Sequence, residues 1–215
     1  MLRALIFDMD GVIVDSEGHH ERAFLEVLRE IGYGDKHGCC YADYVGRSDL
    51  ELWADFLSRH KPAQTIAQLA ALKRAKMVDI IARERPLFSD APRLIQLVAA
   101  RYALALASGS ERPVVEAVLR LENLHRFFSV VVTDSDVKRG KPAPDILLRA
   151  ADALVVAPAE CCVIEDSKPG ISAALAAGMS VVAITNTHAA TELQQATHVV
   201  QTYAELERLL LEQLA

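Results

Sequence analysis

The sequence predicts an α/β fold, a doubly wound parallel sheet with an inserted α-helical domain. Short apolar runs alternate with helical patterns from residue 86 to the C-terminus, and this alternation is typical of parallel strands joined by right-handed helical crossovers. One more apolar run stands at the N-terminus, and an uninterrupted helical pattern separates it from the others. The helical segment is therefore expected to be an insert after the first strand.

The first strand is expected at residues 2–7, because this nearly continuous apolar run is followed at once by Asp8-Met9-Asp10-Gly11. Such a run suits a strand that is buried on both faces and ends in a loop. Five more strand-like runs lie at residues 102–107, 130–133, 161–164, 181–184 and 198–200. Helical stretches lie at residues 92–99, 113–121, 145–153, 169–177 and 203–214.

The insert contains three helical patterns. Its apolar side chains recur at helical spacing, and they are Ala23, Val27 and Leu28, then Leu50, Trp53, Ala54 and Leu57, then Ile66, Leu69, Leu72, Met77 and Ile80. Trp53 is the single tryptophan, and its place in the second pattern indicates a core residue of the insert. We expect the helical domain at residues 16–83 and the sheet domain at residues 1–15 and 84–215.

Composition narrows the class of protein. The chain has 215 residues, 52% of them hydrophobic, and a net charge of −6, which argues against the broad positive surface of a nucleic-acid-binding protein. Its apolar runs fall far short of the roughly 20 residues that cross a bilayer, so we expect no membrane span. The N-terminal run ends in two aspartates and does not fit a signal-peptide core. We expect a cytoplasmic monomer or weak homodimer.

Open α/β sheets bind ligands outside the carboxyl ends of their strands, so the residues after each strand are candidates for a site. Four places carry polar groups, and these are Asp8 with Asp10, Ser108-Gly109-Ser110, Lys141, and Glu165-Asp166. Each one alone also fits an ordinary turn or helix start. A fifth place, Asn186-Thr187-His188, follows the fifth strand and could face the same cleft, but a polar turn at the strand end is the preferred interpretation.

These loops would gather up to four carboxylates around one lysine. Two like charges about 4 Å apart repel by roughly 4 kcal/mol at an effective dielectric constant near 20, so the cluster needs a cation. Carboxylate and carbonyl oxygens suit Mg²⁺, which keeps several waters and accepts a substrate phosphate. Zinc would favour clustered Cys and His side chains.

A phosphate at this place would find hydrogen-bond donors in the Ser108 hydroxyl, the backbone N–H groups near Ser110 and the Lys141 ammonium. Asp8 could attack the phosphorus, because aspartate is a known phosphoryl acceptor in enzymes. Asp10, two residues further on, could protonate the leaving oxygen and later take a proton from water.

This set of strand-end residues resembles the motifs of the haloacid dehalogenase superfamily. Within it, the chain is similar to the subgroup that contains β-phosphoglucomutase and many sugar-phosphate phosphatases. The resemblance is carried by the four groups above in their order, together with Asp15, Gly140-Lys141-Pro142 and Gly170. It implies a Rossmann-like core with a small helical cap. It also implies that Asp8 is the nucleophile and Asp10 the general acid and base, that Ser108, Gly109 and Lys141 hold the phosphate, and that Asp8, Asp10, Asp166 and Glu165 bind Mg²⁺.

In that subgroup the cap supplies specificity contacts. The resemblance implies substrate-binding roles for His20, Gly46, Arg47 and Lys73, although His20, Arg47 and Lys73 are also compatible with solvated surface groups. The chain departs from the mutase in the loop of Gly46, where Val45 and Asp49 replace two cations, and in Arg112, which replaces an expected Asn.

Three functions follow from these residues. A mutase must hold a bisphosphate intermediate at both ends, so the loss of two cap cations favours a Mg²⁺-dependent phosphatase acting on small phosphomonoesters, such as sugar or polyol phosphates, through an aspartyl-phosphate. The alternative is an isomerase of the β-phosphoglucomutase type, indicated by His20. A non-catalytic binding domain on the same fold is the third hypothesis, which the joint presence of Asp8, Asp10 and Lys141 disfavours. The expected partner is a small phosphorylated metabolite.

Overall fold

The computed structural model describes residues 1–44 and 49–213. The chain divides into two compact units, a sheet unit of Met1–Asp15 with Pro86–Ala215 and a helical unit of Ser16–Arg85. Among the described residues, no helix is long and apolar enough to cross a membrane.

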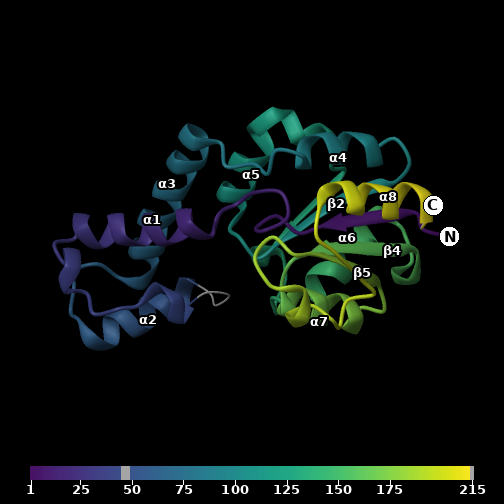
Figure 1. The fold of residues 1–215 in the computed structure, drawn as a ribbon. Coiled ribbons are helices and arrows are strands. Elements are labelled where there is room, and N and C mark those ends of the chain that lie inside the picture. The colour runs from purple at the N-terminus through teal and green to yellow at the C-terminus, as the bar shows by residue number, and fades with distance from the viewer. Residues whose placement is uncertain (45–48, 214–215) are drawn as a thin grey trace. The chain divides into compact units, whose positions relative to one another are not determined.

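The sheet unit contains six parallel strands in the order β3-β2-β1-β4-β5-β6. The strands are β1 Ala4–Phe7, β2 Ala103–Ser108, β3 Val130–Thr133, β4 Cys161–Glu165, β5 Ser180–Ile184 and β6 His198–Val200. The order reverses on either side of β1, which lies between β2 and β4 (Figure 1). The doubly wound parallel sheet predicted from the sequence is thereby confirmed, with an insert of helices after β1.

Five α-helices belong to the sheet unit as described. They are α4 Ala91–Val98, α5 Arg112–Arg120, α6 Asp145–Leu154, α7 Lys168–Ala176 and α8 Tyr203–Arg208. The helical stretch expected over residues 203–214 divides into two parts: α8 ends at Arg208, and the chain continues as a π-helix over Leu209–Gln213. The Tyr102 hydroxyl donates to the Leu210 carbonyl at 2.7 Å, a tertiary bond that helps hold this wider turn.

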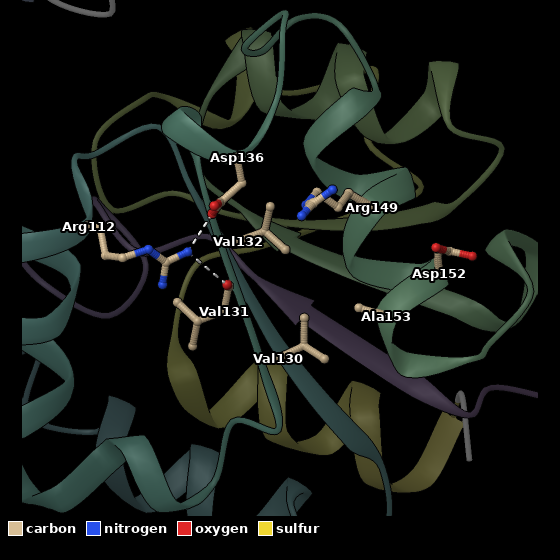
Figure 2. Close-up of a pocket in the computed structure, with 8 residues that line it drawn as sticks. All are labelled: Arg112, Val130, Val131, Val132, Asp136, Arg149, Asp152 and Ala153. Carbon is tan, nitrogen blue, oxygen red and sulfur yellow. Dashed lines mark hydrogen bonds and ion pairs between the residues drawn. The ribbon is translucent and has the colours of Figure 1, made fainter.

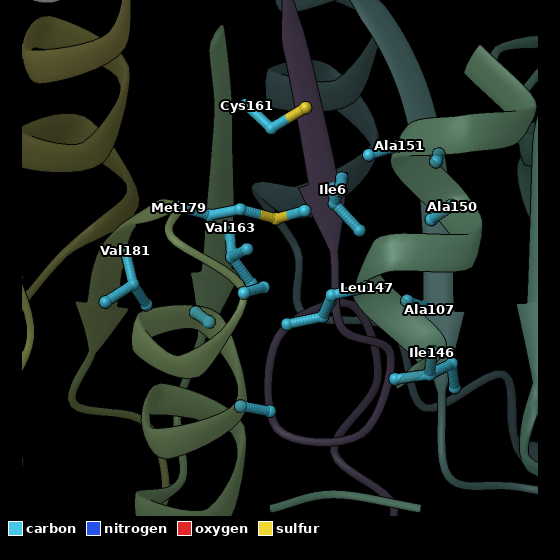
Figure 3. Packing of buried hydrophobic residues seen from close by; sticks show 14 of the residues in the cluster. Ile6, Ala107, Ile146, Leu147, Ala150, Ala151, Cys161, Val163, Met179 and Val181 are labelled. Carbon is cyan, nitrogen blue, oxygen red and sulfur yellow. The ribbon is translucent and has the colours of Figure 1, made fainter. Parts of the chain in front are cut away.

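Complete burial explains why β1 forms. All four of its side chains are at most 1% exposed, and the strand pairs in parallel with β2 on one side and β4 on the other. Small side chains on α6 let this helix pack closely on the sheet. Figure 3 shows Ala150 and Ala151 of α6 beside Ile6 of β1, with Leu147 directed toward the same layer.

A tight loop follows β1 and carries the first two aspartates. The Met9 carbonyl accepts from the backbone N–H groups of Ile13 at 2.8 Å and Val14 at 3.1 Å. Gly11 adopts φ +76°, in the left-handed region where a Cβ is unfavourable. The loop therefore turns back on itself within a few residues and keeps Asp8 and Asp10 at the carboxyl end of the sheet.

The helical unit consists of α1 Glu17–Glu30, α2 Asp49–Arg59 and α3 Ile66–Glu84, with two short 3₁₀ turns. Thr65 starts α3 with a capping box, in which its hydroxyl accepts from the Gln68 backbone N–H at 3.3 Å. Phe24 of α1 packs against Trp53 of α2 with ring centroids 5.1 Å apart, and both are fully buried. The expectation that Trp53 is a core residue of the insert is confirmed.

Replacing Phe24 by alanine should destabilise the helical unit by about 3–5 kcal/mol, because the change leaves a cavity beside Trp53. Trp53 is the single tryptophan of the chain, so its fluorescence reports on this unit during urea unfolding. The control is Leu50→Ala, which removes a side chain that is 60% exposed and should change the unfolding midpoint little. Equal midpoints for the two variants would contradict the packing described.

Candidate active site

Neighbouring strands bring the predicted site residues to one edge of the sheet. Asp8 follows β1 directly, Ser108 is the last residue of β2, and Glu165 is the last residue of β4. Lys141 comes from the loop between β3 and α6 and reaches the same place. Because these strands are parallel and adjacent, their carboxyl ends meet, as the sequence pattern predicts.

Lys141 is the centre of the site. Its Nζ donates to Asp8 Oδ1, to Glu165 Oε1 at 2.7 Å and to the Ala107 carbonyl at 3.2 Å. Burial by itself would lower the pKa of Lys141, but the charges of Asp8 and Glu165 outweigh it and raise the pKa above its ordinary value. Lys141 is therefore a permanent cation that holds two carboxylates from different strands.

Glu165 is fully engaged by the protein. Its Oε2 accepts from the backbone N–H of Asp166 at 2.8 Å and from the backbone N–H and hydroxyl of Ser167 at 2.9 and 2.8 Å, while Oε1 accepts from Lys141. Burial alone would raise the pKa of Glu165, but Lys141 and these hydrogen bonds lower it. Its carboxylate also occupies the space that a Cβ on Gly170 would need, which explains a glycine at this position of α7.

The other two buried carboxylates carry an electrostatic cost. Burial raises the pKa of Asp8 well above its usual range; Lys141 opposes this, while Glu165, Asp166 and Asp10 add to it. Burial and then the charge of Glu165 raise the pKa of Asp166 to about 7. One lysine does not balance this much negative charge, so the site would favour an additional cation.

Asp10 is held toward the serines after β2. Its Oδ2 accepts from the Ser110 hydroxyl at 2.7 Å and from the Ser108 hydroxyl at 3.4 Å. The Ser108 Oγ also accepts from the Ser110 backbone N–H at 3.0 Å. The groups expected to move a proton and to bind a phosphate thus lie side by side, with Gly109 between the two serines.

The loop after β5 also belongs to this edge of the sheet, which the interpretation as a simple polar turn missed. The Thr187 hydroxyl donates to Asp166 Oδ2, and the Asn186 side chain donates to the Gly11 carbonyl at 2.8 Å. The available signal was position, because β5 lies next to β4 in a doubly wound sheet and its carboxyl end faces the same way.

Two of the expected substrate-binding residues lie in the helical unit. Lys73 Nζ is 3.5 Å from His20 Nδ1 and 5.9 Å from the centroid of the Tyr41 ring. Lys73 is 2% exposed, so the alternative that it is a solvated surface charge is wrong; the facing surfaces of α1 and α3 enclose it. Gly46 and Arg47 lie outside the described residues.

Arg112, the departure from the mutase pattern, bonds to β3 and to the turn after it. Its guanidinium donates to Asp136 Oδ2 at 2.5 Å and to the Val131 carbonyl at 3.5 Å. It lines a pocket of about 280 Å³ beside the edge strand β3, where Arg149 and Asp152 of α6 form the other wall (Figure 2). Arg112 therefore ties the start of α5 to the turn after β3.

A magnesium ion fits the chemistry of the main site. Among residues 1–44 and 49–213, no three or more His, Cys, Asp or Glu side chains are arranged to hold a metal by themselves. Mg²⁺ does not need such a cage, because it binds through one or two carboxylates and completes its shell with waters and a substrate phosphate. Asp8 and Asp166 offer buried oxygens in a site with excess negative charge, which is the donor set of a hard cation.

A doubly wound sheet with a helical insert after β1, and with Asp8, Lys141 and Glu165 joined at its carboxyl edge, defines a hydrolase of the haloacid dehalogenase type. The chain belongs to the haloacid dehalogenase-like hydrolases, which it matches over residues 2–178. The resemblance stated from the motifs is confirmed.

Particular relatives share nearly the whole chain. The sequence is 34% identical over 193 residues to the fructose-1-phosphate phosphatase YqaB of Escherichia coli strain K12, a match that covers 83% of this chain and 94% of YqaB. A variant of CbbY from Rhodobacter sphaeroides in complex with xylulose-(1,5)bisphosphate has a TM-score of 0.83 at 28% identity and covers 96% of both chains. The β-phosphoglucomutase of Clostridium difficile has a TM-score of 0.78 at 24% identity, covering 96% of this chain and 97% of the mutase, which shows a shared fold.

Replacing Lys141 by methionine should lower the free energy of unfolding by about 3–5 kcal/mol at neutral pH, because it leaves two buried carboxylates without their cation. The measurement is urea unfolding followed by circular dichroism. Lys138→Met is the matched control, since Lys138 is exposed in the same loop and its loss should cost little. A Lys141→Met variant as stable as the control would contradict the central role of this lysine.

Proposed function

We propose that this hydrolase is a Mg²⁺-dependent phosphatase that releases phosphate from small phosphomonoesters of sugars or polyols through a phosphorylated Asp8. The observation that carries the proposal is the contact between Asp8 and Lys141 beside Asp10 at the carboxyl edge of the sheet. An aspartate held next to a fixed cation and a second aspartate has the parts needed for a phosphoryl acceptor with its own proton donor.

In the first step an oxygen of Asp8 attacks the phosphorus, and the bond from phosphorus to the ester oxygen breaks. Asp10, in its protonated form, gives its proton to the departing oxygen, so that the alcohol leaves neutral. Lys141 would offset the charge that develops on the phosphoryl oxygens, and the Ser108 hydroxyl would donate to them. A bound Mg²⁺ would supply further neutralisation of these oxygens.

In the second step Asp10, now a carboxylate, takes a proton from water as the water oxygen attacks the phosphorus. The bond between phosphorus and the Asp8 oxygen breaks, inorganic phosphate is released, and both aspartates return to their starting states. The proposed ligands of the ion are the Asp8 and Asp166 carboxylates and the Asp10 backbone carbonyl. Glu165 assists by orienting Lys141, since both of its oxygens already accept hydrogen bonds from the protein.

The substrate class is supported by the relatives. YqaB of Escherichia coli is named for the hydrolysis of fructose 1-phosphate, and the CbbY variant binds a sugar bisphosphate. Both ligands are small phosphorylated sugars, and the identities are near one third and below. We therefore propose a phosphorylated sugar or polyol as the substrate.

The helical unit is proposed to select the part of the substrate that does not react. Lys73 is buried beside His20 and the Tyr41 ring, and keeping an ammonium group buried carries a desolvation cost that a functional role would explain. We propose that Lys73 and His20 bind the substrate, together with Gly46 and Arg47 of the segment outside the described residues.

Purified protein with Mg²⁺ should release inorganic phosphate from members of a panel of sugar and polyol phosphates, and Asp8→Asn should abolish this release. The amide cannot act as the phosphoryl acceptor, so we expect a loss of at least about 10³-fold in kcat. Asp152→Asn is the control, because Asp152 is an exposed carboxylate on α6 and its loss should leave kcat unchanged. Phosphate release by Asp8→Asn at the rate of the control would exclude the mechanism.

The same panel separates the alternatives. A coupled assay that follows conversion of β-glucose 1-phosphate to glucose 6-phosphate, with little phosphate release, would identify an isomerase instead. Binding of phosphorylated compounds without any Mg²⁺-dependent turnover across the panel would identify a binding domain.

Replacing Lys73 by methionine should raise KM for the best substrate by about tenfold or more while changing kcat less, because a group that binds the non-reacting part of the substrate contributes mainly to binding. Lys76→Met is the control; Lys76 lies one turn further along α3 and pairs with Glu30 at 2.9 Å. If both variants keep the wild-type KM, Lys73 has no role in recognition.

A further inference from the structure

Asn186 and Thr187, in the loop after β5, connect two parts of the site that come from distant segments of the chain. The Asn186 side chain donates to the Gly11 carbonyl at 2.8 Å, in the loop that carries Asp10. The Thr187 hydroxyl donates to Asp166 Oδ2, in the loop after β4. Two consecutive residues thus hold the two acidic loops from the same side.

The loops also touch each other directly at Gly11. A Cβ built on Gly11 would overlap the Asp166 carboxylate, so this carboxylate rests against the glycine backbone. The contacts therefore close a ring that runs from Asp166 to Gly11, from Gly11 to Asn186, and through Thr187 back to Asp166. A ring of this kind limits the position of the carboxylate more than any single hydrogen bond.

Tyr203, the first residue of α8, adds two hydrogen bonds to this ring of contacts. Its hydroxyl donates to the Val12 carbonyl at 2.6 Å and accepts from the Asn186 side chain at 3.1 Å. Asn186 thereby uses both amide hydrogens, one on Gly11 and one on Tyr203, which leaves it little freedom to rotate.

Thr187 uses its hydroxyl in a defined direction. A hydroxyl carries one proton, and the Thr187 hydroxyl donates it to Asp166 Oδ2. His188 Nδ1 lies 2.9 Å from the same hydroxyl oxygen and is then the donor to it. Thr187 is therefore bonded on both sides, and its bond to Asp166 Oδ2 restricts the orientation of the Asp166 side chain.

We propose that Asn186 and Thr187 are positioning residues that hold the Asp166 carboxylate against Gly11, so that this carboxylate and Asp8 present their oxygens to Mg²⁺. The proposal rests on the proposed function for the identity of the ion. Residues that hydrogen-bond to metal ligands commonly contribute roughly 10- to 100-fold to metal affinity. We expect an effect of this size on Mg²⁺ affinity when Thr187 loses its hydroxyl.

The test is isothermal titration of the purified protein with MgCl₂ in the absence of substrate. Thr187→Val keeps the shape of the side chain and removes the hydroxyl, and it should raise the Kd for Mg²⁺ by about tenfold or more. Thr187→Ser restores a hydroxyl and should recover most of the affinity. Thr191→Val, an identical change at an exposed neighbouring position, is the control and should bind Mg²⁺ like the wild type.

A second pair of variants separates metal positioning from general stability. Tyr203→Phe removes a hydroxyl bonded to the Val12 carbonyl. Tyr102→Phe removes a hydroxyl bonded to the Leu210 carbonyl at 2.7 Å, and Tyr102 directly precedes β2, at the opposite end of that strand from Ser108. Both changes should lower the melting temperature. Only Tyr203→Phe should weaken Mg²⁺ binding.

The outcomes distinguish the two proposals. Wild-type affinity for Mg²⁺ in Thr187→Val would overturn the role of this loop while leaving the proposed phosphatase intact. Failure of the wild-type protein to bind Mg²⁺ or to show Mg²⁺-dependent turnover would instead overturn the proposed use of the ion, and the loop's role with it.

Discussion

The buried contact of Lys141 with Asp8 and Glu165 is the interaction on which the site depends. Three loops from different parts of the sheet unit meet there, and each contributes a charge that would be costly to bury alone. The lysine satisfies two carboxylates at once, and its third hydrogen bond goes to the Ala107 carbonyl of β2. Removing the lysine would leave both carboxylates buried without their cation.

The surrounding chain is shaped by this contact. Gly170 lacks a side chain where Glu165 needs room, and the backbone of Asp166 and Ser167 supplies donors to the same carboxylate. Gly11 likewise lacks a side chain where the Asp166 carboxylate lies. These small residues at helix starts and turns let acidic side chains approach the backbone closely, so that N–H groups and glycine surfaces replace the lost water.

The site nevertheless keeps an excess of negative charge. Asp166 holds a pKa of about 7 because burial and Glu165 oppose its ionisation. Stability alone would not select such an arrangement, since buried carboxylates are better replaced by apolar groups. The proposed Mg²⁺ would relieve this repulsion, which would link the electrostatic cost in the free protein to binding of the cation.

Much of this fold and site could be predicted from the sequence, because strand and helix periodicity are local properties and the strand-end motifs occupy known places in a doubly wound sheet. The π-helical turn over Leu209–Gln213 could not, because the Tyr102 hydroxyl that bonds the Leu210 carbonyl there comes from a distant segment. Lys73 illustrates the same limit, since its position on α3 predicts a helix but not the packing against α1 that buries it.

By itself, the sequence determined the fold class, the order of the strands' motifs and the membership of Asp8, Asp10, Ser108, Lys141, Glu165 and Asp166 in one site. Only the tertiary structure decided how these groups are paired: Lys141 with Asp8 and Glu165, Asp10 with Ser110, and Asp166 with Thr187. The physical reason is that local periodicity places residues at strand ends. The hydrogen-bond partners are far apart in the sequence, and their side chains come within bonding distance only after the strands have packed.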